Sequence, residues 1–339
     1  MTRSAVPYRS IIRAYLLSGY VVVGLAFWQF ASRTAGVPFP TDILQSNPSW
    51  VIVEQMMGSV PRIQASFSEP AGLAFYLSGL CFCCLWLTAH GDRMMHMTWL
   101  LALSILAMLL STSTTGLLTL AVGLPLIMVL TAARADRQAL ARLGKTGGML
   151  MLGGLIALTP VVIMKPALLD AVSGVVDNTL TKGDSDSYAD RTATDVAALD
   201  TVSTTYGLGV GWGSFRSSSL VPGLLANAGV FGLVAVLWLG LRTTQLVRRR
   251  TAAMRDHPGC LVVGGFSAAL CGQLTAALFS APTIASLAFF LQLGCVIGVS
   301  ARMSIEAGLL KSSSVGRPGS PRTGGATVTP VTAQGSFVG

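Results

Sequence analysis

The stretch LVPGLLANAGVFGLVAVLWLGL, residues 220–241, runs for 22 positions without a charged side chain. A helix needs about 20 predominantly apolar residues to cross the hydrocarbon core of a bilayer. The segment RTTQLVRRR, residues 242–250, follows directly, and arginine clusters of this kind mark the cytoplasmic end of a membrane helix, where they contact anionic lipid. The stretch therefore predicts a membrane-spanning helix that begins on the outer side.

The rest of the chain repeats this apolar pattern. Of its 339 residues, 52% are hydrophobic and 11% are charged, whereas soluble domains carry about 25% charged residues. We expect an all-α, polytopic membrane protein with about eight transmembrane helices within residues 1–311. The Ser-, Gly-, Thr- and Pro-rich segment 312–339 is expected to be a disordered cytoplasmic tail. The other predicted spans are 11–31, 71–89, 98–112, 116–133, 149–165, 260–280 and 284–301.

The distribution of charge predicts the orientation in the membrane. With the N-terminus inside, 17 of the 23 Lys and Arg residues and only 4 of the 14 Asp and Glu residues fall on inner segments. Inner segments of membrane proteins carry an excess of Lys and Arg, so both termini are expected to be cytoplasmic. The net charge of +9 is then a signal of topology, and no nucleic-acid partner is expected.

Two predicted outer segments, about 32–70 and 166–219, are too long for simple turns, and long loops often carry function. The first ends in Ser68-Glu69-Pro70, a typical helix start. Glu69 is then either only a helix cap or a carboxylate that the helix N-terminus keeps ionised and able to accept a proton. Arg62 lies seven residues earlier and is expected in the same cleft.

The second outer segment contains two more arginines beside unusual sequence. Arg191 begins a stretch whose apolar residues recur at helical spacing, which predicts an amphipathic outer helix. Arg216 lies in GVGWGSFRSSSL, residues 209–220, where Gly209 and its neighbours predict a tight turn. The simpler interpretations are an ion pair of Arg191 with a nearby Asp and an Arg216 that snorkels at the membrane surface. The other turn residues of interest are Gly211, Trp212, Gly213, Ser214 and Phe215.

The outer segments lack the residues that several other chemistries require. All three histidines fall on inner segments and all six cysteines fall within apolar runs, so no metal site and no cofactor are expected. Ser217, Ser218 and Ser219 have no histidine nearby in the sequence to activate them as nucleophiles. The cysteines are interpreted as small apolar core residues.

Three blocks of the sequence resemble the bacterial O-antigen polymerase and O-antigen ligase superfamily, most closely its exopolysaccharide polymerases. They are RIQASFSEPAGLAFYL (62–77), STSTTGLLTLAVGLPLIMVL (111–130) and GLGVGWGSFRSSSLVPGLLANAGVFGLVAVL (207–237). The third is the most specific, because a G-x-G-x-G-S-x-R turn is followed by N-x-G-x-x-G at Asn227, Gly229 and Gly232. The resemblance covers roughly residues 60–240.

The resemblance implies metal-independent glycosyl transfer on the periplasmic face of the bacterial inner membrane. The donor would be an oligosaccharide on a polyprenyl diphosphate and the acceptor a sugar hydroxyl, with a chain-length regulator protein as a further partner. Arginine forks suit a departing diphosphate and a carboxylate suits removal of the acceptor proton. The residues implied as catalytic are Glu69, Arg191 and Arg216. Those implied in substrate binding are Arg62, Gly211, Trp212, Gly213 and Ser214.

The sequence departs from the family pattern in two ways. Only one predicted span precedes the Arg62–Glu69 block, where the family usually has several. The second outer segment holds no histidine, which disfavours an O-antigen-ligase-type transferase and favours a polymerase. Two other classes remain open: a transporter or flippase of a lipid-linked glycan, and a scaffold of an export assembly. Against ion-coupled transport, the predicted spans contain almost no ionisable residues.

Overall fold

The computed structural model describes residues 6–45, 56–57, 60–92, 94–133, 137–164, 186–254, 257–280 and 286–315. Its first half contains helices α1 (Tyr8–Ala35), α2 (Thr41–Leu44), α3 (Pro70–Ala89), α4 (Met97–Leu110), α5 (Thr114–Ala133) and α6 (Arg137–Met164), with a short 3-10 helix η1 (Met94–His96). Its second half contains α8 (Asp186–Thr204), α9 (Leu220–Ala253), α10 (Gly259–Ser280) and α11 (Leu287–Val315). Strand β1 (Met56–Met57) pairs antiparallel with β2 (Val60–Pro61).

The fold is that of a helical membrane protein, as the sequence predicts. Within the described residues, five helices are long and apolar enough to cross a membrane: α1, α3, α9, α10 and α11. Met94–Leu110 and Thr114–Pro125 are shorter apolar helical segments. The apolar runs therefore form helices, because a helix satisfies its own backbone hydrogen bonds where no water is present.

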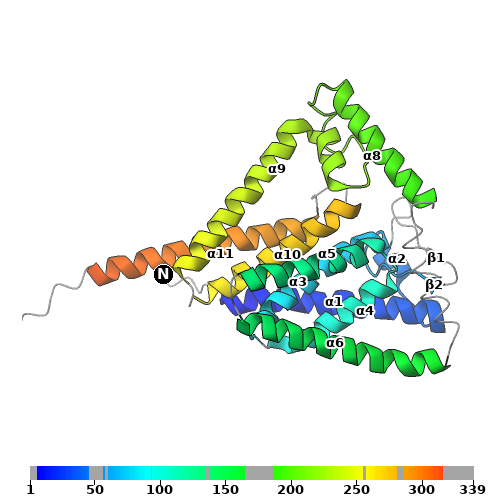
Figure 1. The fold of residues 1–339 in the computed structure, drawn as a ribbon, viewed down its shortest axis with the longest axis horizontal. Coiled ribbons are helices and arrows are strands. Elements are labelled where there is room, and N and C mark those ends of the chain that lie inside the picture. Colours follow the sequence, from blue (N-terminus) through cyan, green and yellow to red (C-terminus); the bar gives the residue numbers. More distant parts are fainter. Residues whose placement is uncertain are drawn as a thin grey trace, which may run out of the picture.

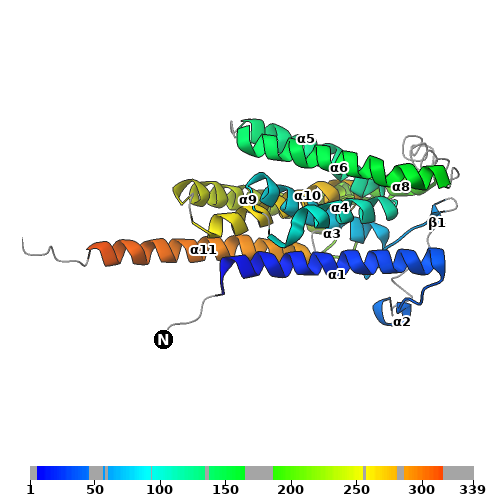
Figure 2. The ribbon, with the colours of Figure 1, turned by 90° about the horizontal axis from the view of Figure 1, so that it is seen from below.

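The helices are arranged in layers, with α3 near the centre (Figures 1 and 2). Seen from below, α1 and α11 lie on one side, α5 and α6 on the other, and α3, α4, α9 and α10 between them (Figure 2). Most of α3 is buried, and α10 is its principal neighbour. Helix α3 runs across the bundle from Glu69 at one end to His90 at the other, which is about 30 Å at 1.5 Å per residue.

Small residues allow α3 and α10 to pack closely. A Cβ atom on Gly272 of α10 would lie 2.7 Å from the carbonyl oxygen of Ser78 on α3, and one on Gly265 would lie 3.3 Å from the Sγ atom of Cys83. Glycine at a helix crossing brings two backbones together in this way. Cys81, Cys83 and Cys84 are fully buried and unbonded to one another, so their interpretation as small core residues is confirmed.

Several helices extend beyond the predicted apolar spans. Helix α6 begins at Arg137, twelve residues before its predicted span at 149, and α9 continues to Ala253. Helix α11 continues through Ser312 to Val315, into the first residues of the predicted tail. Helical hydrogen bonds can continue into polar sequence once the chain leaves the apolar core, and hydropathy does not detect this. Residues 165–185 and 316–339 lie outside the described residues.

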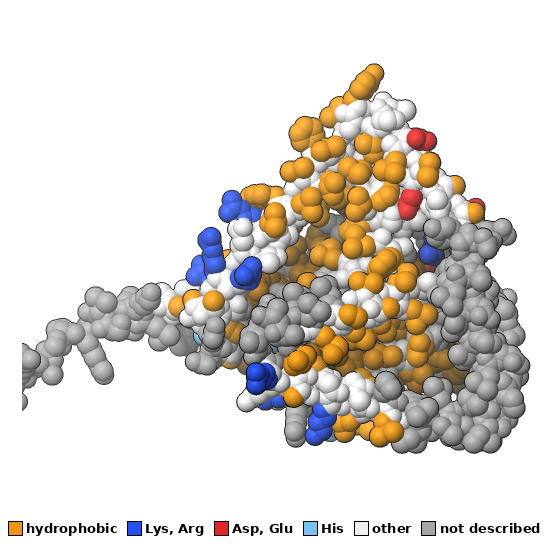
Figure 3. Space-filling model, viewed as in Figure 1, with side chains coloured by type: hydrophobic (Ala, Val, Ile, Leu, Met, Phe, Trp, Pro, Cys, Tyr) orange, Lys and Arg blue, Asp and Glu red, His pale blue; other side chains and the backbone are white. Residues whose placement is uncertain are grey.

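Helices α8 and α9 pack against each other and project beside the bundle (Figure 1). The α9 surface carries large exposed apolar side chains, and they form part of the apolar face in Figure 3. Basic side chains gather at the left of this face, near the C-terminal end of α9, whereas acidic ones lie over α8 (Figure 3). An apolar face of this kind is typical of contact with lipid. Its members on α9 include Phe231, Val234, Leu237, Trp238 and Leu241.

Candidate functional site

The Glu69 carboxylate lies at the start of α3 but does not cap it. Glu69 is the N-cap residue, with extended backbone dihedral angles, and Pro70 occupies the first helical position. The side chain makes no capping hydrogen bond, and its Oε1 atom instead lies 3.5 Å from Nη2 of Arg216. Glu69 therefore occupies the N-cap position, as the simpler interpretation has it, but its side chain does not make the capping contact.

The backbone that leads to Glu69 is fixed by a buried amide of α1. Oε1 of Gln29 accepts hydrogen bonds from the backbone N–H groups of Gln64 and Ala65, both at 2.8 Å. Gln45 donates to the Ala65 carbonyl at 3.0 Å, and Ala65 has φ = 52°. A non-glycine residue in the left-handed region is uncommon and must be held by its surroundings. Gln29 of α1 thus holds the segment before Glu69 in place. Nothing in the sequence indicated this contact.

Arg62 lies in the same site. Its Nε atom donates to the carbonyl oxygen of Ser111, 3.4 Å away at the end of α4. Burial lowers the pKa of Arg62, the positive charge of Arg191 lowers it further, and the negative charge of Glu69 opposes both. These electrostatic effects are local. Arg62 therefore lies within electrostatic range of both Glu69 and Arg191, and Arg216 pairs with Glu69.

The glycine turn is inserted into a break in α9. Gly207, Gly209, Gly211 and Gly213 all have positive φ, and Gly229 within α9 has φ = 66° and ψ = −169°. Three backbone hydrogen bonds join the turn to the break in α9. The N–H groups of Val210 and Gly211 donate to the carbonyl oxygens of Ala226 (2.8 Å) and Asn227 (2.9 Å). In the opposite direction, the N–H group of Val230 donates to the Gly207 carbonyl oxygen (2.9 Å). The backbone of the turn thus replaces helical hydrogen bonds that α9 loses at the break.

Asn227 holds the residue that precedes Arg216. Its Oδ1 atom accepts a hydrogen bond from the Phe215 N–H group, and its Nδ2 atom donates to the Phe215 carbonyl, both at 2.9 Å. Nδ2 also donates to the Gly223 carbonyl at 2.8 Å. The spacing between the glycine turn and the N-x-G motif therefore has a structural reason: the two motifs form one unit.

Asp195 of α8 anchors the start of α9. Its Oδ1 atom accepts hydrogen bonds from the Ser217 hydroxyl (2.9 Å) and from the N–H groups of Ser218 (2.8 Å) and Ser219 (3.2 Å). Its Oδ2 atom accepts one from the Ser219 hydroxyl at 2.6 Å. Burial alone would raise the pKa of Asp195, but these hydrogen bonds bring it below the ordinary value of 3.8. The three serines thus form a binding site for this carboxylate, and Asp195 is a positioning residue.

The remaining predicted residues lie on the surface of the turn. Gly211, Trp212, Gly213 and Ser214 are exposed, and 56% of Trp212 is accessible. The Arg216 side chain is 86% exposed and that of Glu69 is 46% exposed. Arg216 therefore reaches Glu69 across the surface of the molecule. Within the described residues, no group of three His, Cys, Asp or Glu side chains is placed to hold a metal ion.

Removal of the Asp195 carboxylate should loosen the junction between α8 and α9. We expect Asp195→Ala to destabilise this junction by about 1–3 kcal/mol, because several part-buried donors lose their acceptor. The folded-state pKa lies below the unfolded value, so the contribution is complete above pH 3.8 and is lost as the pH falls through the lower folded value. Hydrogen exchange at the Ser218 and Ser219 amides measures this. Asp190→Ala, an exposed carboxylate on the same helix, is the control and should leave both amides protected.

Comparison of the chain with protein-family models, with curated proteins and with solved structures gives no match.

Proposed function

We propose that this protein is a polysaccharide polymerase, which joins polyprenyl-diphosphate-linked repeat units by metal-independent glycosyl transfer. One observation carries the proposal: the Glu69 carboxylate lies 3.5 Å from the Arg216 guanidinium. The charge of Arg62 acts on Glu69, and that of Arg191 acts on Arg62. A carboxylate beside several arginines provides a base for the acceptor and cations for a diphosphate leaving group. The resemblance of the three sequence blocks to O-antigen polymerases supports the same chemistry.

In this mechanism, the acceptor hydroxyl oxygen attacks the anomeric carbon of the donor sugar. The new C–O bond forms as the bond between that carbon and the diphosphate oxygen breaks. Glu69 takes the hydroxyl proton. The diphosphate leaves with the bonding electron pair, and the guanidinium groups of Arg216 and Arg191 stabilise its negative charge with forked hydrogen bonds. Arg62, which is less exposed than Arg216, adds positive charge to the site.

The ion pair between Glu69 and Arg216 must open before the reaction. Both side chains are exposed, and exposed ion pairs contribute only about 0–1 kcal/mol. A diphosphate carries more negative charge than one carboxylate and offers more acceptor oxygens, so it competes effectively for Arg216. Donor binding therefore frees Glu69 to act as the base, and the pair holds both groups in place until the donor arrives.

Substitution of Arg216 by lysine tests the geometric part of this proposal. We expect Arg216→Lys to lower polymer synthesis from the purified lipid-linked repeat unit about tenfold or more, because lysine keeps the charge but loses the bidentate fork. Arg248→Lys, an exposed arginine at the far end of α9, is the matched control. Equal polymer yields from the two variants would argue against diphosphate binding by the Arg216 fork.

The proposed reaction requires a defined topology. We propose eight membrane crossings, formed by α1, α3, α4, α5, α6, α9, α10 and α11, with both termini in the cytoplasm and the Glu69 site on the periplasmic face of the inner membrane. The supporting observation is the distribution of charge between the two ends of the spans. The membrane lipid and a chain-length regulator are the proposed partners besides the substrate.

Reporter fusions test this topology. A fusion at Thr251, at the end of α9, should report the cytoplasm, because it follows the arginine cluster. A fusion at Asp184, which lies outside the described residues, should report the periplasm. The same result at both positions would contradict the orientation of α9.

A further inference from the structure

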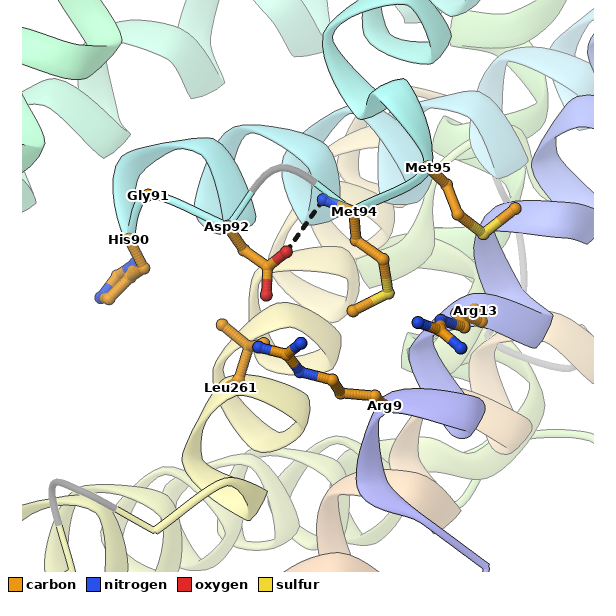
Figure 4. Close-up of a pocket in the computed structure, with 8 residues that line it drawn as sticks. All are labelled: Arg9, Arg13, His90, Gly91, Asp92, Met94, Met95 and Leu261. Carbon is orange, nitrogen blue, oxygen red and sulfur yellow. Dashed lines mark hydrogen bonds between the residues drawn. The ribbon is translucent and has the colours of Figure 1, made fainter.

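A cavity of about 690 Å³ opens at the opposite end of α3 from Glu69. It lies between the start of α1, the turn after α3 and the start of α10, and Figure 4 shows its lining side chains. His90 and Asp92 border it on one side, and Arg9 and Arg13 of α1 extend into it from the other (Figure 4). The polymerase proposal assigns no role to this cavity, since α3 separates the two ends by about 30 Å.

The cavity contains more positive charge than its own side chains neutralise. Arg9 and Arg13 are one helical turn apart, and like charges at this spacing repel each other. Both side chains are exposed, and within the described part of the chain neither guanidinium has a hydrogen-bond or ion-pair partner. Two cations are thus directed into one cavity without a partner among the residues that the structure describes.

The neighbouring polar groups have other partners. Oδ1 of Asp92 accepts a hydrogen bond from the Met94 N–H group at 2.9 Å and so fixes the turn after α3. Nδ1 of His90 lies 2.9 Å from the Trp86 carbonyl oxygen. A third arginine, Arg142 of α6, donates to the Ala89 carbonyl at 3.1 Å and lies against Gly91, which lines the cavity. These contacts leave Arg9 and Arg13 as the groups available to a ligand.

The lining also has an apolar part. Met94, Met95 and Leu261 complete the wall beside the two arginines (Figure 4). Guanidinium groups bind phosphate through forked, charge-assisted hydrogen bonds, and an apolar wall suits the carbon skeleton that carries the phosphate. We infer that this cavity binds the phosphate group of an anionic ligand, which is either a lipid headgroup or a soluble phosphate compound.

Thermal unfolding of the full-length protein in a neutral detergent tests this inference. The probes are phosphatidylglycerol, phosphatidylcholine and inorganic phosphate. Phosphatidylglycerol or inorganic phosphate should raise the Tm saturably, and phosphatidylcholine should not. In the double variant Arg9→Gln/Arg13→Gln, the apparent Kd of the active probe should rise about tenfold or more, because two charge-assisted contacts are lost. A shift with phosphatidylglycerol alone identifies a lipid ligand, and a shift with inorganic phosphate identifies a soluble one.

A matched double variant separates a site from general surface attraction. Arg248→Gln/Arg249→Gln removes the same charge from exposed positions on α9, outside the cavity, and should leave the Kd unchanged. Leu261→Trp keeps every charge but fills the cavity, so it should also weaken binding of the probe. If the Arg9 and Arg13 double variant does not fold, binding by Leu261→Trp tests whether the cavity is the site. Equal effects of the two arginine double variants, normal binding by Leu261→Trp, or no saturable shift with either anionic probe would overturn the inference.

Discussion

Glu69→Gln is expected to abolish polymer formation while the protein still inserts in the membrane and the lipid-linked repeat unit accumulates. Glutamine keeps the size and most of the hydrogen-bonding capacity of glutamate, but it cannot take the acceptor proton. Loss of a positioned general base typically lowers a rate by about 10²–10⁴-fold. The ion pair with Arg216 is also lost, but this exposed contact contributes too little stability to unfold the protein. Gel analysis of polymer and of the lipid-linked pool in cells measures both expected changes.

Asp200→Asn is the matched control for this experiment. Asp200 is an exposed carboxylate of α8 in the second predicted outer segment, and the proposed mechanism does not use it. Its substitution should leave polymer yield unchanged. Normal polymer from Glu69→Gln would exclude Glu69 as the base. Because Asp195 is occupied by the serines that precede α9, the search would then turn to Asp190.

Gly229→Ala is expected to have the second largest effect. A Cβ atom at this position would collide with the carbonyl oxygens of Gly207 and Leu208. In addition, φ = 66° with ψ = −169° is a conformation that only glycine adopts readily, and other residues pay about 1–3 kcal/mol for it. The glycine turn should therefore separate from α9, and Arg216 should lose its position beside Glu69. We expect at least a tenfold loss of polymer and a lower Tm.

Gly240→Ala is the control for the Gly229 variant, since it makes the same substitution in the same helix. A Cβ atom at Gly240 would meet no atom within 4 Å, and alanine is favoured over glycine within a helix by about 1 kcal/mol. This variant should be as active as the parent and equally or more stable. Full activity of Gly229→Ala would show that the break in α9 does not position the site.

The sequence predicted the helices better than their ends. Apolar runs locate α1, α3, α9, α10 and α11 because a bilayer requires long uncharged segments. The start of α6 at Arg137 was not predicted, because hydropathy does not depend on the backbone hydrogen bonds that define the end of a helix. Helix α8 was anticipated from the helical spacing of its apolar residues, although Val196 and Leu199 prove to be about half exposed.

The sequence indicated which charged residues to consider for the site, but it did not indicate the contacts that hold them in place. Arg216 pairs with Glu69, and Arg62 lies within electrostatic range of Glu69 and Arg191, whereas their catalytic roles stay predictions. The supporting contacts join segments far apart in the sequence, as Gln29 does with residues 64 and 65. A lone glutamine inside an apolar run gives no indication of its partner. The positioning role of Asp195 was not predicted, although three consecutive serines before a helix were a signal that a carboxylate would bind there.

The central position of α3 has a consequence for biosynthesis. Its principal neighbour, α10, begins at Gly259, so about 170 residues must be made after Ala89 before the two helices can meet. At 5–20 residues per second, this takes roughly 10–30 s. During that time the small-residue face of α3 must be shielded by lipid or by the insertion machinery. A chain truncated before Gly259 would leave this face uncovered, and quality-control proteases should remove such a chain even though the Glu69 and Arg216 positions are both present.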